Sequence, residues 1–113
     1  MIIYEVNLSI NQSIFDQYFT WLKPHVADML NFDGFRRAQI NEEIQTDDKE
    51  IRSITVRYAI DSWPYLEDYL ENHAYRMRDE GIELFKDQFS AKRKSYTILD
   101  TISINKQTEA NII

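Results

Sequence analysis

Cysteine is absent from this chain of 113 residues, and glycine and proline occur only twice each. Without cysteine the chain cannot form disulfides, thiolate nucleophiles or cysteine-based zinc sites, and this composition is compatible with a reducing cytoplasm. With two glycines it also has no glycine-rich loop of the kind that holds phosphate groups. We therefore expect a cytoplasmic domain with short loops and no phosphate-binding loop.

Long apolar runs and surplus positive charge are missing as well. No segment approaches the run of about 20 apolar residues that crosses a membrane. Glu5 and Asn7 interrupt the start of the chain, where a secretion signal would be apolar. The 13 basic residues are outnumbered by 19 acidic ones, so the net charge is −6. Because this charge repels polyanions, we expect neither a membrane nor a nucleic acid as partner.

What the chain does contain is apolar side chains, which make up 43% of its residues. They alternate, as in half-buried strands, in three segments, and a fourth segment that is rich in charge also reads as a strand. A helical pattern follows the first and the third of these four segments. The strand segments are residues 2–10, 35–45, 51–60 and 90–99. We place one domain at residues 1–100 and a tail at residues 101–113, which could be a further strand, an arm exchanged with a partner, or frayed.

The order strand, helix, strand, strand, helix, strand predicts the α+β class. It is the ferredoxin-like βαββαβ arrangement, an antiparallel four-stranded sheet with two helices on one face. In this topology the first and third strands are central. The side chains that we expect on the helix side are Ile2, Tyr4, Val6, Leu8 and Ile10 of the first strand, Ala38, Ile40 and Ile44 of the second, and Ile54, Val56, Tyr58 and Ile60 of the third.

Start and break signals bound the two helices. Asn11 or Ser13 can cap the first helix, and Pro24 predicts a kink or a restart near residues 22–23, because proline lacks the backbone donor. Gly81 predicts the end or a break of the second helix. The apolar stripes are Phe15, Phe19, Leu22, Val26 and Met29 on the first helix and Trp63, Leu66, Leu70, Ala74 and Met77 on the second.

The sheet face away from the helices has nothing in the chain to cover it. We expect Glu5 and Arg57 to pair across the central strands there. RNA-binding sheets of this topology carry aromatic residues at these positions, which are polar here. The face is therefore solvated, or it packs on a second copy and closes two sheets into a barrel, and we favour this homodimer. Its expected members are Glu5, Asn7, Arg37, Gln39, Ser53, Thr55, Arg57, Arg93, Ser95 and Thr97.

Basic residues gather on the edge strands. Lys92, Arg93 and Lys94 lie together on the fourth strand, and Arg36 begins the second. Charged side chains on an edge strand commonly prevent unwanted strand pairing, and we favour this role over a binding patch.

His25 and His73 are the only histidines. Each lies about twelve residues into its helix, so the two could sit at similar depth and share a ligand, a proton or a metal. The simpler interpretation is that each is partly buried with one hydrogen bond. A zinc site needs three or four ligands, and no spacing of ligands supports one. We predict no metal site.

Aromatic residues make up 13% of the chain. They could line a pocket between helices and sheet for a small apolar or aromatic molecule, or they could simply form the core, which we favour for stripes at helical spacing. The acidic pairs are consecutive in sequence and point to different faces, so they form no general acid–base pair. The candidate pocket residues are Phe15, Tyr18, Phe19, Trp21, Trp63, Tyr65, Tyr69 and Tyr75.

Five stretches resemble a family of small bacterial domains without an assigned function. They are residues 1–7, 21–26, 34–36, 69–74 and 85–89 together with Arg93. The resemblance extends over residues 1–98 and implies the dimeric α+β barrel type of ferredoxin-like fold. Relatives of that type include cofactor-free monooxygenases, haem-handling enzymes and ligand sensors. The matching positions that we nominate for a ligand site are Trp21, His25, His73 and Arg93.

These observations favour a dimeric binding or interaction module without catalytic activity and without a cofactor. The alternative is a cofactor-independent, monooxygenase-like enzyme that acts on a small hydrophobic or aromatic molecule in a pocket between helices and sheet. In that case His25 or His73 would transfer the proton and the aromatic residues would form the walls.

Overall fold

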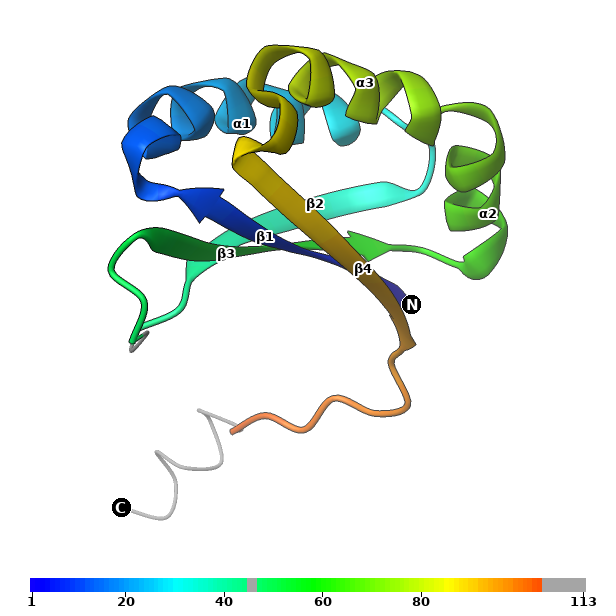
Figure 1. Ribbon diagram of the computed structural model, residues 1–113. Helices are drawn as coiled ribbons and strands as arrows, with labels where there is room; N and C mark the ends of the chain where they lie inside the picture. Colours follow the sequence, from blue (N-terminus) through cyan, green and yellow to red (C-terminus); the bar gives the residue numbers. More distant parts are fainter. Residues whose placement is uncertain (45–46, 105–113) are drawn as a thin grey trace.

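The computed structural model describes residues 1–44 and 47–104. Its elements follow the predicted order, except that the second helix is divided in two (Figure 1). No helix of this described part is long and apolar enough to span a membrane. In chain order the elements are β1 (Ile2–Asn11), η1 (Gln12–Ile14), α1 (Phe15–Met29), β2 (Phe35–Glu42), β3 (Ile51–Ile60), α2 (Trp63–Asn72), α3 (Ala74–Phe85), η2 (Lys86–Gln88) and β4 (Phe89–Thr97).

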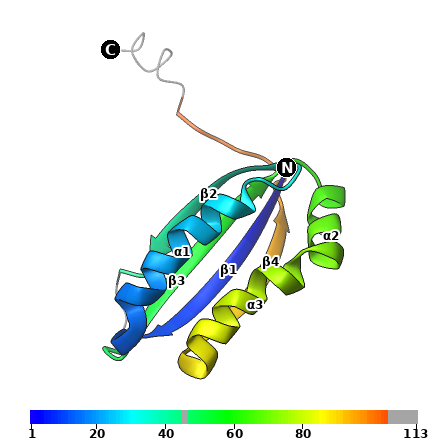
Figure 2. The ribbon, with the colours of Figure 1, turned by 90° about the horizontal axis from the view of Figure 1, so that it is seen from above.

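The four strands form one antiparallel sheet in the order β2-β3-β1-β4. The prediction that β1 and β3 are central is therefore confirmed. The register sets Val6 opposite Val56 and Tyr4 opposite Tyr58. The two alternating apolar sets thus share one face, because directly paired residues of an antiparallel sheet point to the same side. All three α-helices lie on that face (Figures 1 and 2).

α1 runs without interruption through Pro24, so the predicted restart is wrong. Pro24 is exposed, and the carbonyl that loses its helical partner there can be hydrated by solvent, which limits the cost of the missing donor. The predicted caps are wrong too. α1 is preceded by the 3₁₀ turn η1, and Ile14 at its N-cap position has no capping hydrogen bond from its side chain.

The second helix breaks at His73, whose backbone (φ −130°, ψ −27°) leaves helical geometry. The prediction of a break at Gly81 is wrong, because Gly81 lies buried inside α3. The break lets α2 occupy the end of the sheet where β1 begins, while α3 turns back to run over the sheet beside α1 (Figure 2). Gly81 has a packing role: an added Cβ there would lie 2.8 Å from Cη2 of Trp21.

β4 presents the side opposite to the one predicted. Arg93 pairs with Val6 and Ser95 with Tyr4, so Arg93, Ser95 and Thr97 are on the helix side of the sheet. The open face carries Lys92, Lys94 and Tyr96 instead, since these pair with Asn7, Glu5 and Ile3. The sequence of β4 has no alternation of large apolar residues, which would have fixed this choice.

β2 ends at Glu42, earlier than predicted, and Ile44 is 94% exposed. Ile44 therefore does not belong to the side chains of β2 that face the helices. Gln45, the predicted last residue of the strand, lies outside the described residues. After β4, the amide of Ile98 donates to the carbonyl of Met1 at 3.0 Å, and residues 99–104 have no regular structure. The predictions for the tail (a further strand, an exchanged arm or fraying) concern mainly residues 105–113, which lie outside the described residues.

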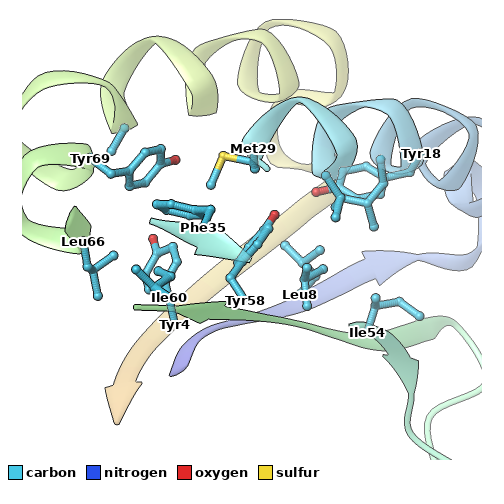
Figure 3. Close-up of a cluster of buried hydrophobic side chains, with 14 of the residues drawn as sticks. Tyr4, Leu8, Tyr18, Met29, Phe35, Ile54, Tyr58, Ile60, Leu66 and Tyr69 are labelled. Carbon is cyan, nitrogen blue, oxygen red and sulfur yellow. The ribbon is translucent and has the colours of Figure 1, made fainter. Parts of the chain in front are cut away.

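The core lies between the sheet and the helices, and it combines aromatic rings with a larger number of aliphatic side chains (Figure 3). Tyr58 of β3 stacks on Tyr4 of β1 at a centroid distance of 6.0 Å, and Phe35 and Tyr69 pack around them. Each buried ring removes a large apolar area from water and stabilises the fold. Of the aromatic residues predicted to form the core, Phe15, Tyr18 and Tyr69 are buried in it, and Phe19 and Trp21 pack against it. The prediction is wrong for Trp63, Tyr65 and Tyr75, which are exposed. The core does not fill all of the space between helices and sheet.

Candidate functional site

A cavity of about 390 Å³ lies between α1, α3 and the sheet. This volume is within the range of small-molecule sites, about 300–1,000 Å³. Much of its wall is apolar. The aliphatic and thioether side chains of that wall come from three strands and both covering helices: Val6, Leu8, Leu22, Met29, Val56, Met77, Ile82 and Ala91.

Three tyrosine hydroxyls open into this cavity. Tyr18 of α1, Tyr58 of β3 and Tyr69 of α2 have buried rings, and all three line the cavity. Figure 3 shows Tyr58 rising from the sheet between the other two. None of the three hydroxyls has a hydrogen-bond partner within residues 1–44 and 47–104. The hydroxyl oxygens are not fully enclosed, since the buried polar side-chain atom without a partner in the described chain is Nε of Arg78. They can therefore hydrogen-bond to a molecule or to water in the cavity.

Burial keeps these tyrosines protonated. It raises the pKa of Tyr69 to about 12 and raises the pKa values of Tyr18 and Tyr58 further, because a phenolate would lose its hydration there. The charge of Arg93 acts in the opposite sense on all three pKa values. At neutral pH the cavity therefore presents three neutral hydroxyl groups that can donate or accept hydrogen bonds.

Trp21 and His25 form the α1 side of the cavity. They lie one helical turn apart, and their rings stack with centroids 4.5 Å apart and planes at 25°. Burial lowers the pKa of His25, and the nearby charges of Glu80 and Asp28 only partly counter this. His25 is accordingly a neutral imidazole at neutral pH, which can accept a proton.

Among the residues that the structure describes, three cationic side chains and no carboxylate line the cavity. They are Arg78 of α3, Lys86 of η2 and Arg93 of β4. A terminal nitrogen of Arg78 donates to the hydroxyl oxygen of Tyr4 at 3.0 Å. Its Nε is buried and has no hydrogen-bond partner in the described part of the chain. The site thus combines apolar walls with polar groups that converge on one space.

Of the four nominated ligand residues, Trp21, His25 and Arg93 line this cavity and His73 does not. His73 caps the junction of α2 and α3, where Arg76 donates to its Nδ1 and the Phe32 ring lies 4.7 Å from it. Its Nε2 lies 3.6 Å from the Asp68 carboxylate. The structure thus places the two histidines among different neighbours. Across residues 1–44 and 47–104, no group of three or more acidic or histidine side chains is placed to hold a metal ion.

The sequence analysis missed Tyr4, Tyr58, Arg78 and Lys86 as site residues. The sequence does contain a signal for Arg78. This residue lies four positions after Ala74 and three before Gly81, on the apolar stripe of α3. An arginine on the buried side of a helix needs a partner, and such positions often mark sites. Tyr4 and Tyr58 were assigned to the core, which is where their rings do lie.

The sheet order, the helices on one face and the cavity between them define a ferredoxin-like α+β domain with a potential small-molecule site. The chain belongs to the family described as Domain of unknown function (DUF4286), whose model matches residues 1–102. A comparison with curated proteins finds no match.

Solved structures share the fold. A protein from Nitrosomonas europaea with the provisional description of an antibiotic biosynthesis monooxygenase aligns with a TM-score of 0.66 and 15% identity, over 88% of this chain and 100% of that chain. SnoaB, a cofactor-independent oxygenase from Streptomyces nogalater, aligns with a TM-score of 0.62 and 11% identity, over 89% of this chain and 96% of that chain.

The likeness extends to a protein without natural function. Foldit4, a de novo designed protein, aligns with a TM-score of 0.56 and 14% identity, over 86% of this chain and 97% of that chain. At such identities the similarity shows the architecture alone. The function must therefore be argued from the cavity and its residues.

Proposed function

We propose that this domain binds a small aromatic molecule in the cavity between α1, α3 and the sheet. The observation that carries this proposal is that the hydroxyls of Tyr18, Tyr58 and Tyr69, which have no partner in the described chain, line a cavity whose walls are largely apolar. Apolar walls with a few convergent polar groups are typical of small-molecule sites. The aromatic rings of the walls favour an aromatic guest, because offset and edge contacts add to area burial.

Binding of the neutral fluorescent probe N-phenyl-1-naphthylamine tests this function. We expect one probe per chain, with fluorescence transfer from tryptophan. In Ala91→Phe the added ring fills the cavity from β4 and should lower affinity at least tenfold. Leu84→Phe adds a ring on the exposed side of α3, outside the cavity, and should leave binding unchanged. Equal affinity of both variants and the native chain would refute the cavity as the binding site.

A second candidate function is a cofactor-independent enzyme of monooxygenase type, with His25 as proton acceptor. Two observations favour it. His25 is a neutral imidazole on the cavity wall, and two proteins of the same fold are described as a cofactor-independent oxygenase and, provisionally, as an antibiotic biosynthesis monooxygenase. A base positioned beside a bound aromatic molecule can remove an acidic proton from it, as the first step of such chemistry.

Proton abstraction can be measured without knowing the substrate. The probe 2-indanone has acidic C–H groups next to an aromatic ring, and their exchange for deuterium can be followed by NMR. We expect exchange to be faster with the native chain than with His25→Gln, and His73→Gln to match the native rate. Equal rates for the native chain and His25→Gln would exclude His25 as the base.

We also propose that two copies pack through their open sheet faces. The centre of this face is a closed polar network: Glu5 accepts from Tyr96 at 3.2 Å and lies 3.8 Å from Arg57, and Thr55 donates to Asn7 at 2.9 Å. Internally satisfied polar groups can be covered at low desolvation cost.

Charge at the two edges of the open face favours the same packing. Lys92 and Lys94 lie on the β4 edge, and Glu43 lies past the end of β2 on the other edge. A two-fold axis along the strands would set the lysines of one copy near the acidic end of the other.

A further inference from the structure

We propose that the molecule held in this cavity is an amphipathic organic anion, with an apolar aromatic body and a carboxylate-type group on the side formed by α3, η2 and β4. This inference rests on the proposed function and names the ligand class for the same site. It specifies the charge of the ligand and the residues that bind the charged group, which the proposal of an aromatic ligand does not.

The charge of the cavity is the reverse of the charge of the whole chain. The chain carries 19 acidic and 13 basic residues. Within residues 1–44 and 47–104, the cavity is lined by three basic residues and no acidic one. None of these three cations forms an ion pair with a carboxylate within the described part of the chain. A concave site with one sign of charge attracts ligands of the other sign.

Arg78 has the geometry of an anion receptor that is held in place. The Tyr4 hydroxyl accepts from one of its terminal nitrogens, which fixes the guanidinium at the cavity wall. Its Nε is buried and without a partner in the described chain. A buried N–H with no acceptor is costly, and a guanidinium matches the two oxygens of a carboxylate. A ligand carboxylate would provide the missing acceptor.

Lys86 occupies a backbone position that favours glycine. Its φ of +52° is the only positive φ of a non-glycine residue in the described chain. The residue connects α3 to η2 at the cavity, and its ammonium group has only a 3.5 Å contact with the carbonyl of Glu83. Strained positions persist where the side chain has a task, and a lysine beside an anion site would have one.

Arg93 completes the set from the sheet edge. It projects from β4 on the helix side, opposite Val6. Its charge reaches Tyr18, Tyr58 and Tyr69 across the cavity, which lowers the cost of negative charge there. The three cations come from three consecutive elements, so they surround one side of the cavity and leave the α1 side to Trp21 and His25.

Two probes that differ only in charge test this inference. The probe 8-anilinonaphthalene-1-sulfonate is N-phenyl-1-naphthylamine with one added sulfonate. We expect the native chain to bind the sulfonate probe at least tenfold more tightly, since a charge-assisted hydrogen bond to Arg78 is worth about that factor. We expect 1-naphthoate to displace it and inorganic phosphate not to, because phosphate lacks the apolar body.

Matched variants assign the effect to named residues. Arg78→Met should reduce the preference for the sulfonate probe about tenfold, and Arg76→Met, on the exposed side of the same helix, should preserve it. If Arg78→Met does not fold by circular dichroism, the exposed pair Arg93→Gln and Lys92→Gln serves instead. Arg93 is on the cavity side and Lys92 is on the open face, so only the first should reduce the preference.

The outcomes separate this inference from the proposed function. If both probes bind equally and Ala91→Phe blocks both, the cavity is a binding site and the anion inference is overturned. If the two variants of a matched pair lose the preference equally, general surface charge explains it and the inference is again overturned. If neither probe binds the native chain, the proposed function fails, and the inference fails with it.

Discussion

Gly81 of α3 lies directly against the indole ring of Trp21 of α1. A Cβ at position 81 would come within 2.8 Å of Cη2 of that ring and 3.3 Å of two further ring atoms. Glycine inside a helix costs about 1 kcal/mol relative to alanine. The absence of a side chain at position 81 lets the Trp21 ring approach α3 closely beside the cavity, with Cη2 as its nearest atom.

Gly81→Ala should therefore change binding more than stability. The gain in helix propensity, about 1 kcal/mol, opposes an overpacking cost of about 1–3 kcal/mol, because Tyr18, Phe85 and His25 confine the ring. We expect the free energy of unfolding to fall by about 0–2 kcal/mol and probe affinity to fall at least tenfold. Urea unfolding and fluorescence titration measure the two effects.

A double variant provides the control for this prediction. Trp21→Phe shortens the ring, so Gly81→Ala should be stabilising in that background, by about 1 kcal/mol. If Gly81→Ala costs the same stability with Trp21 and with Phe at position 21, contact with the indole is not the reason for the glycine.

Acid should destabilise the fold partly through His25. Its pKa in the folded chain lies below the ordinary value of 6.5 because burial disfavours the charged form. The unfolded chain binds the proton more readily, so the stabilisation is complete above about pH 6.5 and is lost as the pH falls through the folded pKa. The charges of Glu80 and Asp28 favour the protonated imidazole and reduce the effect.

His25→Gln removes this titration. We expect its unfolding free energy to depend less steeply on pH than that of the native chain between about pH 7 and pH 5. NMR titration of the imidazole C–H signals of the native chain gives the folded pKa directly. A value for His25 above 6.5 would contradict a partly buried imidazole that is neutral at neutral pH.

Lys86→Gly should stabilise the domain and weaken anion binding at once. Relief of the positive φ stabilises the folded chain by about 1–3 kcal/mol. Glycine also makes the unfolded chain more flexible, which offsets about 0.4–1 kcal/mol of this gain. We therefore expect the free energy of unfolding to rise by about 1 kcal/mol. Affinity for the sulfonate probe should fall while affinity for the neutral probe persists. A variant that is less stable than the native chain would show that Lys86 is not strained.

A charge at the centre of the open face should separate the proposed dimer. Thr55→Arg places a second guanidinium beside Arg57 on each copy, and two such faces repel each other. Thr20→Arg makes the same change on the exposed side of α1, away from the sheet. Native mass spectrometry should show a dimer for the native chain and Thr20→Arg and a monomer for Thr55→Arg. A native monomer would refute the sheet-to-sheet packing.

Sequence patterns predicted the sheet well where alternation is strong. Leu8 and Ile54 lie where their alternation placed them, because one buried face fixes the register. The pattern failed on β4, where Lys92, Arg93 and Lys94 give no apolar side. Which of these residues faces the helices depends on the pairing with β1, a long-range contact that a local pattern does not contain.

The site was only partly accessible to sequence reasoning for a related reason. Trp21 and His25 lie one helical turn apart, so their stacking follows from local geometry. Arg78 meets Tyr4, a residue 74 positions away, only because α3 folds back over β1. Gly81 was interpreted as a helix breaker because the sequence alone does not show the ring that packs on it.

The most direct test of the account is a ¹H–¹⁵N NMR titration of the native chain with 1-naphthoate. The chain has two indole N–H signals, from Trp21 at the cavity and from Trp63 of α2, whose Nε1 donates to Glu67 outside the cavity. The account predicts a saturable shift of the Trp21 signal, assigned with Trp21→Phe, and an unmoved Trp63 signal. A shift of Trp63 alone, or no shift of either signal, would contradict an aromatic anion site between α1, α3 and the sheet.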